Sequence, residues 1–215
     1  MKILNLYACL GGNRYKWNEV KDDIEVTAVE LDEELARLYQ ERFPNDKVII
    51  ADAHQYLLDH YKEYDFIWSS PPCPTHSRIN ISQYTRDCWK PRYPDMALYQ
   101  EIIFLKHYYK GKYCIENVIP FYETLIPAEK RNRHLYWTNF KLPNTLSKRK
   151  NPDLSRTKNL ITALSNFHDY DFRKYKGSQR KNKIARNLVD YEAGKTILES
   201  VLEINKNKYK QTELF

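Results

Sequence analysis

Short apolar runs recur along the first 140 residues of the chain, and polar or turn-forming residues separate them. The runs are rich in Val, Ile, Leu, Phe and Tyr and are about four to eight residues long, which is typical of β-strands. We predict strands at residues 3–8, 25–30, 47–51, 65–69, 112–118 and 134–140.

Helical patterns lie between these runs. Residues 32–43 begin with acidic side chains, repeat apolar side chains at helical spacing and end before Pro44, which predicts an amphipathic helix. We also predict helices over residues 53–61, 95–109 and 190–202. Because strands alternate with helices, we expect an α/β fold, with a mainly parallel sheet and helices on both faces.

The composition is that of a globular protein. Of the 215 residues, 42% are hydrophobic and only 5 are glycine, and no apolar stretch approaches the roughly 20 residues that cross a bilayer. The amino-terminal residues lack the apolar core and the small-residue cleavage site of a signal peptide. We therefore expect one catalytic-sized unit that works in the cytoplasm, without a membrane partner.

Positive charge is concentrated in one stretch of the chain. The formal net charge is +7, yet residues 141–183 alone hold 12 Lys and Arg against 3 Asp and Glu, a net of +9. Phe167, Tyr170, Phe172 and Tyr175 are interleaved with these charges, a mixture that suits contacts with phosphates and stacking on bases. An ordinary solvated basic surface explains the same charges equally well.

The cysteines do not form the close pairs that zinc sites and redox centres use. Cys9, Cys73, Cys88 and Cys114 include no Cys-x-x-Cys motif, and an intracellular chain of this size needs no disulfide framework. Cys73 and His76 are one close pair near Cys88, whereas zinc knuckles use two close pairs. We expect free thiols and no metal ion.

Glycines or acids follow each of the first three predicted strands. Gly11 and Gly12 follow the first, where paired glycines let a backbone turn approach a cofactor, although a tight structural turn has the same signature. Glu30 ends the second, where nucleotide-type sites carry a ribose-binding carboxylate, while Asp32 suits a helix N-cap. Asp52 follows the third and is either an adenine contact or a cap.

A thiol and a carboxylate follow two further strands. Cys73 lies in the Pro-Pro-Cys-Pro turn at residues 71–74, and Glu116 ends the apolar run at 112–118. Because the carboxyl ends of parallel strands form the ligand crevice, the pair predicts a nucleophile and an acid in one site. A buried, inert cysteine is the usual alternative. A carboxylate after an apolar strand must face a ligand, be paired or be protonated.

Together these motifs resemble those of the DNA (cytosine-5)-methyltransferases. Pro72-Cys73 resembles the family's Pro-Cys nucleophile motif, and Glu116-Asn117-Val118 resembles its Glu-Asn-Val motif. Further motifs follow in family order over roughly residues 3–202. They are the glycine-rich loop Ala8-Cys9-Leu10-Gly11-Gly12, the ribose acid Glu30, the adenine-contacting acid Asp52, the arginine motif Arg131-Asn132-Arg133 and the late motif Arg186-Asn187-Leu188-Val189.

The resemblance implies a Rossmann-like S-adenosylmethionine-dependent methyltransferase that methylates C5 of cytosine in double-stranded DNA on a flipped base. The sequence leaves the oligomeric state open, with a monomer expected. It makes Cys73 the covalent nucleophile and Glu116 the partner of N3, and it assigns Arg133, with Arg131, to O2 of the base. The residues expected to bind S-adenosylmethionine are Tyr7, Ala8, Leu10, Gly11, Gly12, Glu30, Leu31, Asp52, Ala53, Pro71, Asn187 and Val189.

The resemblance also divides the chain. We expect a catalytic core at 1–140, a small basic target-recognition region at 141–183, a segment returning to the core at 184–205 and a frayed tail at 206–215. The loop at 77–92 is the candidate for closing over the flipped base. The candidate nucleic-acid contacts, for which ordinary surface is an equal alternative, are Ser77, Arg78, Arg86, Lys90, Lys148, Arg149, Lys150, Arg173 and Lys174.

Several positions depart from the family pattern. Tyr7 and Cys9 stand where Phe and the first Gly of the glycine-rich loop are usual, and Arg186 replaces the late Gly. The arginine motif has an uncertain register, because Arg133-His134 can also be the aligned pair. The alternatives are an RNA cytosine methyltransferase and a nucleic-acid-binding relative whose cofactor site has decayed. The shortness resembles compact phage-borne members, and a role in restriction-modification stays open.

Overall fold

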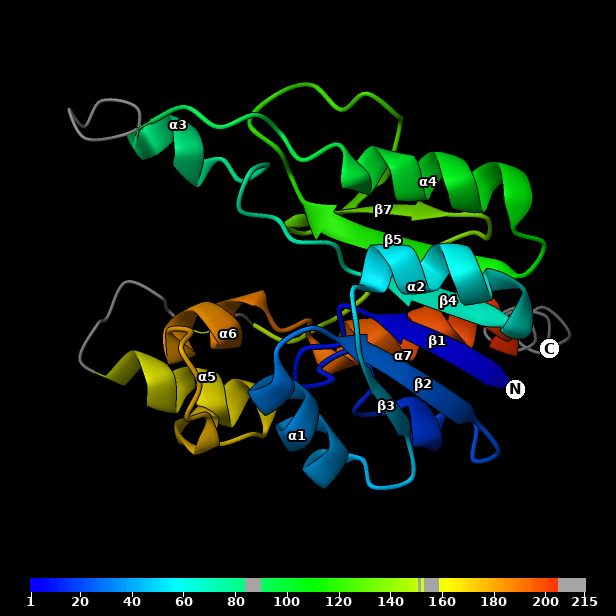
Figure 1. The fold of residues 1–215 in the computed structure, drawn as a ribbon, viewed down its shortest axis with the longest axis horizontal. Helices are drawn as coiled ribbons and strands as arrows, with labels where there is room; N and C mark the ends of the chain where they lie inside the picture. Colours follow the sequence, from blue (N-terminus) through cyan, green and yellow to red (C-terminus); the bar gives the residue numbers. More distant parts are fainter. Residues whose placement is uncertain (84–89, 151, 153–158, 205–215) are drawn as a thin grey trace, which may run out of the picture.

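A mostly parallel sheet runs through the middle of the molecule (Figure 1). The computed structural model describes residues 1–83, 90–150, 152 and 159–204. Within these residues the sheet has seven strands in the order β3-β2-β1-β4-β5-β7-β6. They are β1 (Lys2–Leu6), β2 (Glu25–Glu30), β3 (Lys47–Ile50), β4 (Phe66–Ser69), β5 (Lys112–Val118), β6 (Glu129–Arg131) and β7 (His134–Thr138). Strands β1 to β5 are parallel, and β7 pairs antiparallel with both β5 and β6.

The helices connect the strands and cover both faces of the sheet. They are α1 (Glu33–Arg42), α2 (Ala53–His60), α3 (Ile79–Gln83), α4 (Ala97–Tyr108), α5 (Leu160–His168), α6 (Lys181–Asn187) and α7 (Tyr191–Val201), and 3-10 turns lie at Trp17–Glu19, Tyr61–Glu63 and Phe172–Lys174. The α/β class, the mainly parallel sheet and the helices on both faces are confirmed. The predicted strands and helices are all present, with ends within two residues of the predicted ones.

Two apolar clusters hold the helices against the sheet. One packs α2 and α4 on the first face, where Leu57 and Ile102 lie against Leu4 and Ile67. The other packs α7 and the 3-10 turn at Trp17–Glu19 on the second face. Strands β1, β2, β4 and β5 are buried on both faces, and their sequences are mainly apolar, which is the pattern that predicts them, whereas the edge strand β3 is only partly buried.

Aspartates cap three of the helices that follow strand ends or loops. The Asp32 carboxylate accepts hydrogen bonds from the backbone N–H groups of residues 34 and 35, both at 3.0 Å, and begins α1. Asp52 accepts from the N–H of residue 55 at 2.9 Å and begins α2, and Asp190 begins α7 in the same way. These caps satisfy N–H groups that have no partner inside a helix.

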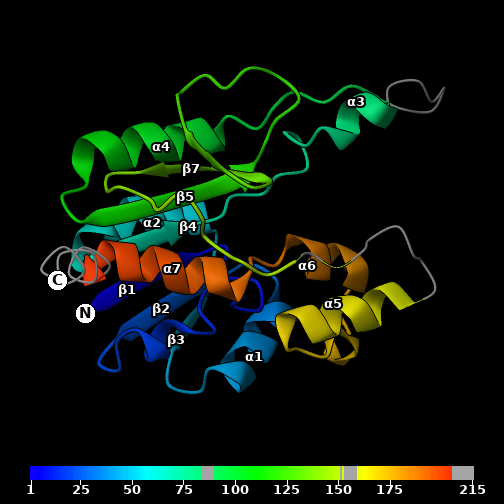
Figure 2. The same cartoon turned by 180° about the vertical axis from the view of Figure 1, so that it is seen from behind.

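The basic region is more ordered than its composition indicates. Residues 141–183 contain α5 and the start of α6, which lie beside α1 (Figure 2). Leu160 and Leu164 of α5 pack in one cluster with Leu35 and Leu38 of α1. No helix was predicted at 160–168, because a nine-residue helix depends on long-range packing for its stability. In the described part of the chain no helix is long and apolar enough to cross a membrane.

Candidate active site

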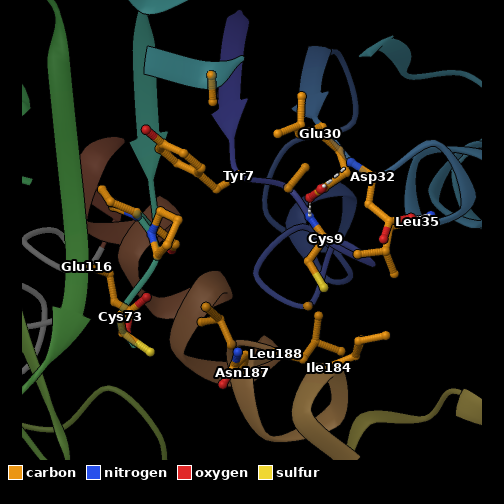
Figure 3. A pocket seen from close by; sticks show the side chains of 18 of the residues that line it. Tyr7, Cys9, Glu30, Asp32, Leu35, Cys73, Glu116, Ile184, Asn187 and Leu188 are labelled. Carbon is orange, nitrogen blue, oxygen red and sulfur yellow. Dashed lines mark hydrogen bonds between the residues drawn. The ribbon is translucent and has the colours of Figure 1, made fainter. Parts of the chain in front are cut away.

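A cavity of about 590 Å³ lies where the strand order of the sheet reverses. The chain runs outward from β1 through β2 to β3, and then crosses to β4 and β5 on the other side of β1. In open α/β sheets the carboxyl ends of strands beside such a switch form the ligand crevice. The loops after β1, β2, β3 and β4 and the carboxyl end of β5 border the cavity, and α6 closes it from the carboxyl-terminal segment (Figure 3).

Most of the residues predicted for the site line this cavity. They are Tyr7, Ala8, Gly12, Glu30, Leu31, Asp52, Ala53, Pro71, Cys73, Glu116, Asn187 and Val189. Leu10 and Gly11 do not line it: Leu10 is fully buried against α1 and α5, and Gly11 lies over Tyr39 and Phe43. These two residues shape the loop and contribute no cavity surface.

The loop after β1 bends sharply before it enters the cavity wall. Tyr7, Cys9 and Gly11 have φ values of 56°, 49° and 66°, so a left-handed backbone recurs at every second residue. A Cβ at Gly11 would lie 2.4 Å from the Phe43 ring, and one at Gly12 would lie 2.3 Å from the Val189 carbonyl oxygen. The glycines therefore allow close approach of the loop to its neighbours, which is the structural use of a glycine pair.

Glu30 joins the loops after β1 and β2. One oxygen of its carboxylate accepts the backbone N–H of Cys9 at 2.8 Å, and the other accepts the N–H of Asp32 at 2.9 Å. Burial raises the pKa of Glu30, and the two N–H donors oppose that rise. Each carboxylate oxygen has a second acceptor position for a ligand hydroxyl. Burial, with the nearby Glu30 charge, raises the pKa of Cys9 to about 12, so this thiol stays protonated at neutral pH.

An exposed apolar side chain and an acid continue the wall beyond Glu30. Leu31 is 67% exposed, and Asp52 is exposed at the amino end of α2. One oxygen of Asp52 caps α2, and the residue also lines the cavity, so the cap and a ligand contact are compatible roles for this acid. The arrangement offers an apolar surface beside hydrogen-bond acceptors.

A buried carboxylate holds the aromatic ring that opens the loop. Glu101 of α4 is fully buried, and it accepts hydrogen bonds from the Tyr7 hydroxyl at 2.5 Å and from the Ser69 hydroxyl at 2.6 Å. His54 lies 3.1 Å from the same carboxylate, which raises the pKa of His54. Burial and Glu101 raise the pKa of Tyr7 far above its usual range, so its hydroxyl acts as a donor. Tyr7 thus has an anchor that a phenylalanine lacks.

Cys73 and Glu116 lie together at the other end of the cavity (Figure 3). Cys73 is partly exposed, whereas Glu116 is 7% exposed. Burial and the Glu116 charge raise the pKa of the Cys73 thiol, and the Lys183 ammonium lowers it. Lys183 lies on α6, four residues before Asn187, and both line the cavity.

The chain after Cys73 is held in a turn. The backbone N–H groups of His76 and Ser77 both donate to the Cys73 carbonyl, at 3.0 and 3.1 Å. The buried His76 ring lies 2.6 Å from the Tyr122 hydroxyl through Nδ1, and burial lowers the pKa of His76. The His76 carbonyl accepts the N–H of Phe121 at 3.0 Å. These bonds fasten the nucleophile loop to the segment that follows Glu116.

The predicted arginines lie outside the cavity lining. Arg131 donates to the carbonyls of Pro143 at 2.6 Å and Leu142 at 3.3 Å, and it forms an ion pair with Glu129. Arg133 is exposed and does not line the cavity. His134, the first residue of β7, lines it instead. The assignment of arginines to O2 of a base therefore has no geometric support here, and the alternative register at 133–134 is the signal that pointed to His134.

Sequence reasoning missed several other residues of the cavity wall. Lys183 is one of them: in the sequence it is one charge among many in the basic region. Its four-residue spacing from Asn187 places both residues on one face of a helix. Ser178 and Gln179 were not considered, and Gln179 donates to Asp32 at 2.9 Å. Nothing local in the sequence marks these two as cavity residues, because their position depends on docking of the basic region onto α1.

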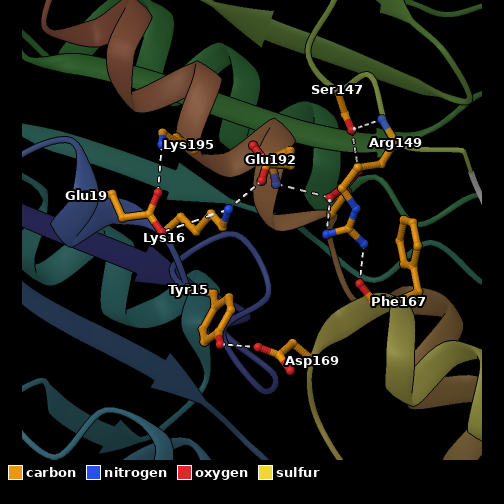
Figure 4. Close-up of polar contacts among 10 residues, drawn as sticks. Tyr15, Lys16, Glu19, Ser147, Arg149, Phe167, Asp169, Glu192 and Lys195 are labelled. Carbon is orange, nitrogen blue, oxygen red and sulfur yellow. Dashed lines mark hydrogen bonds and ion pairs between the residues drawn. The ribbon is translucent and has the colours of Figure 1, made fainter.

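The predicted nucleic-acid contacts are in different environments. Lys90, Lys148, Lys150 and Lys174 are exposed, Arg78 is exposed beside the Pro120 carbonyl, Ser77 is half-buried, and Arg86 lies outside the described residues. Arg173 is exposed and donates to the Thr162 hydroxyl. Arg149 differs, because its guanidinium lies 3.8 Å from the ring centre of Phe167 (Figure 4). It also lies 3.8 Å from the ring centre of Tyr191 and pairs with Asp190. Arg149 thus joins α5 to α7 inside the protein.

No group of three side chains suited to a metal ion occurs among the residues with described positions.

Comparison with known proteins gives a family match and a shared fold. The family model for C-5 cytosine-specific DNA methylase matches residues 1–123. A mutant of DNMT2 from Spodoptera frugiperda is 26% identical, with a TM-score of 0.38, over 54% of this chain and 35% of that chain. This chain thus spans about a third of the DNMT2 chain. The methyltransferase EhMeth from Entamoeba histolytica is 10% identical over 95% of this chain and 98% of its own, with a TM-score of 0.55, which shows a common fold. None of the curated proteins matches.

Proposed function

Because this chain belongs to the C-5 cytosine-specific DNA methylase family, we propose that it transfers a methyl group from S-adenosylmethionine to C5 of cytosine in double-stranded DNA, through a covalent adduct with Cys73. The observation that carries the proposal is one cavity with Cys73 and Glu116 at one end and Glu30 with Leu31 at the other. A methyl donor and a pyrimidine bound in such a cavity would meet at its centre, which removes the entropic cost of their encounter during reaction.

The residues of the Glu30 end fit S-adenosylmethionine, the cofactor of this family. The cavity volume of about 590 Å³ lies within the range of small-molecule sites. Glu30 has acceptor positions for ribose hydroxyls, Leu31 offers an apolar surface for adenine, and Asp52 offers an acceptor for its amino group. Gly12 lines the cavity, and its missing Cβ lets the loop lie against the Val189 carbonyl on the opposite wall. When bound, S-adenosylmethionine supplies an activated methyl group.

The residues of the Cys73 end fit the chemistry of a pyrimidine. Cytosine C5 is a poor nucleophile, and addition of the Cys73 thiolate at C6 makes C5 enamine-like. Negative charge then develops on the ring, and Glu116 stabilises it by sharing a proton with N3 and accepting a hydrogen bond from the exocyclic amine. After C5 is methylated, a base removes the C5 proton, the bond between C6 and sulfur breaks, and Cys73 leaves as a thiolate.

The thiolate must be generated in a partly buried position. Burial and Glu116 raise the pKa of Cys73, so the protonated thiol is favoured when the site is empty. The Lys183 ammonium, which extends from α6, lowers the pKa of Cys73. Because Lys183 extends from the carboxyl-terminal segment, docking of that segment contributes to the charge balance at the nucleophile.

Duplex DNA is the proposed substrate, and the cytosine must leave the stack to reach Cys73. The exposed side chains of Lys90, Lys148, Lys150 and Lys174 supply positive charge for the phosphates. The same charges suit RNA, so the substrate test must include both polymers. A competition between a duplex DNA and a tRNA, with tritiated methyl groups counted on each, separates the two substrates.

Bisulfite sequencing of DNA from cells that express the protein tests the proposal. Methylated cytosines in a fixed sequence context are expected with the natural chain and are expected to disappear with Cys73→Ala. Cys9→Ala is a matched control, because it removes a second thiol that lines the same cavity but stays protonated. Methylation that persists undiminished in Cys73→Ala rules out the covalent mechanism. Calorimetry that detects DNA binding but no S-adenosylmethionine binding would favour a decayed, non-catalytic relative.

A further inference from the structure

His134 and Glu116 face each other across the β5–β7 ladder. Nε2 of His134 lies 3.5 Å from Oε1 of Glu116. In the antiparallel register Val118 pairs with His134 and Glu116 pairs with Tyr136, so both side chains project from the same face of the sheet. The Glu116 side chain is 9% exposed and the His134 side chain is 41% exposed. Both residues line the cavity, and the histidine is the more exposed member of the pair.

Few side chains that can carry positive charge lie near the proposed pyrimidine site. Among the residues described as lining the cavity, the side chains that can carry positive charge are those of His134, Lys183 and Arg186. Of these, the structure gives only His134 a contact with the Glu116 carboxylate, again within the described part of the chain. The guanidinium of Arg131 is used by three backbone carbonyls and Glu129.

The strand register explains why Arg133, the residue before His134, does not contact Glu116. Successive side chains of a strand point to opposite faces of the sheet. A shift of one residue along β7 therefore moves a side chain from the face that carries Glu116 to the opposite face. His134 begins β7 and shares the face of Glu116, whereas Leu135 is buried in the cluster of the opposite face. Arg133 precedes the strand, next to Asn132 in a left-handed turn, and remains exposed.

We propose that His134 is a catalytic residue of the pyrimidine site, whose protonated ring donates a hydrogen bond to cytosine O2 while Glu116 holds N3. This inference rests on the proposed function. Attack at C6 moves negative charge onto O2 and N3, and an N–H donor with a positive charge stabilises that charge in a partly desolvated cavity. The proton stays on the imidazole throughout, so His134 orients and stabilises the base without transferring a proton.

The proposal predicts a pH dependence that an arginine would not produce. Histidine is the side chain that ordinarily changes charge between pH 5 and 8, whereas a guanidinium stays charged. The groups that face His134 are Glu116 from β5, Cys73 from the loop after β4, Lys183 and Arg186 from α6, and its β6 partner in the ladder, Arg131.

Steady-state kinetics on duplex DNA with the methylated sequence tests the catalytic role. His134→Gln keeps an N–H donor without the charge, and its kcat is expected to fall about 100-fold with little change in cofactor affinity. His134→Arg is expected to retain kcat within about tenfold and to lose the decline toward alkaline pH that titration of a histidine causes. His60→Gln is the control, because it removes a histidine at 2.7 Å from an exposed glutamate outside the cavity.

Two measurements separate failure of this inference from failure of the proposed function. If the natural chain methylates cytosine and His134→Gln retains full kcat, or if Arg133→Gln loses more kcat than His134→Gln, the role of His134 is overturned while the methyltransferase stands. NMR spectra of the His134 ring need no turnover. Glu116→Gln is expected to shift the ring resonances of His134, because it removes a charge 3.5 Å from Nε2, and unchanged resonances would overturn the pairing whether or not the protein methylates DNA.

Discussion

The side-chain amide of Asn117 donates a hydrogen bond to the backbone carbonyl of Pro71 at 2.9 Å. Asn117 follows Glu116 at the end of β5, and Pro71 lies two residues before Cys73. Asn117 is 2% exposed, so the bond is protected from water. This buried hydrogen bond therefore ties the strand that carries the carboxylate to the loop that carries the nucleophile. Their separation is set by the fold before a substrate binds.

Asn117→Ala is expected to lower kcat at least about tenfold, because small displacements of reacting groups are costly in rate. Affinity for S-adenosylmethionine, measured by calorimetry, should change much less. Asn139→Ala is the matched control, since Asn139 makes similar bonds to Gly111 and Tyr113 at the opposite end of β5. Equal losses of kcat in the two variants, at equal thermal stability, would show that the Asn117 bond has no special effect on the site.

The reactivity of Cys73 is expected to increase with pH. Because its pKa is raised by burial and Glu116, the thiolate fraction of the free enzyme is small at neutral pH, and alkylation by iodoacetamide should reach half its maximal rate above the pKa of an ordinary cysteine. Lys183→Met removes the cation that opposes this rise, so its alkylation should be slower at each pH below the midpoint.

Peptide mapping by mass spectrometry distinguishes Cys73 from the other thiols in this experiment. Lys181→Met, on the same helix but outside the cavity lining, is the control and should leave the alkylation curve in place. A Lys183→Met curve that superimposes on that of the natural chain would mean that Lys183 does not influence the thiol.

Cys9→Gly is expected to raise the free energy of unfolding by up to about 1 kcal/mol. Cys9 has a φ of 49°, and the left-handed region costs a residue with a Cβ about 1–2 kcal/mol, of which the flexibility of glycine in the unfolded chain offsets part. Cys9→Ala keeps the Cβ and should give no such gain. Urea unfolding without cofactor compares the two, and a glycine variant less stable than the alanine variant contradicts the strain.

Arg149 and Lys150 are neighbours with different expected roles. Arg149→Ala should lower the free energy of unfolding by about 2 kcal/mol, because it loses two aromatic contacts and the Asp190 ion pair. Lys150 is exposed, so Lys150→Ala should leave stability within about 0.5 kcal/mol and reduce the salt dependence of DNA binding by about one phosphate contact. Thermal unfolding and DNA titrations at several salt concentrations check both.

If Arg149→Ala weakens DNA binding as much as Lys150→Ala does and leaves stability unchanged, the structural role of Arg149 is wrong. That result would mean that the guanidinium leaves the rings of Phe167 and Tyr191 to reach a phosphate.

The sequence by itself predicted the α/β core and most of the cavity wall, because the determinants are local. Buried parallel strands require continuous apolar runs, and the helices begin at capping aspartates such as Asp32 and Asp190. Residues that end parallel strands, such as Glu30, Cys73 and Glu116, must meet at one edge of the sheet. Strand β6 was not predicted, because its three residues, Glu129–Arg131, have no apolar pattern.

Only the tertiary structure decided which cations meet the carboxylate and the thiol. A one-residue difference in register places His134 beside Glu116 and leaves Arg133 in solvent, and a motif cannot resolve such a difference. Helix α5 and the position of Lys183 likewise depend on packing of the basic region onto α1, more than a hundred residues away in the chain. Local sequence specifies strand ends and caps, whereas side-chain pairs between distant segments follow from how the packed elements align.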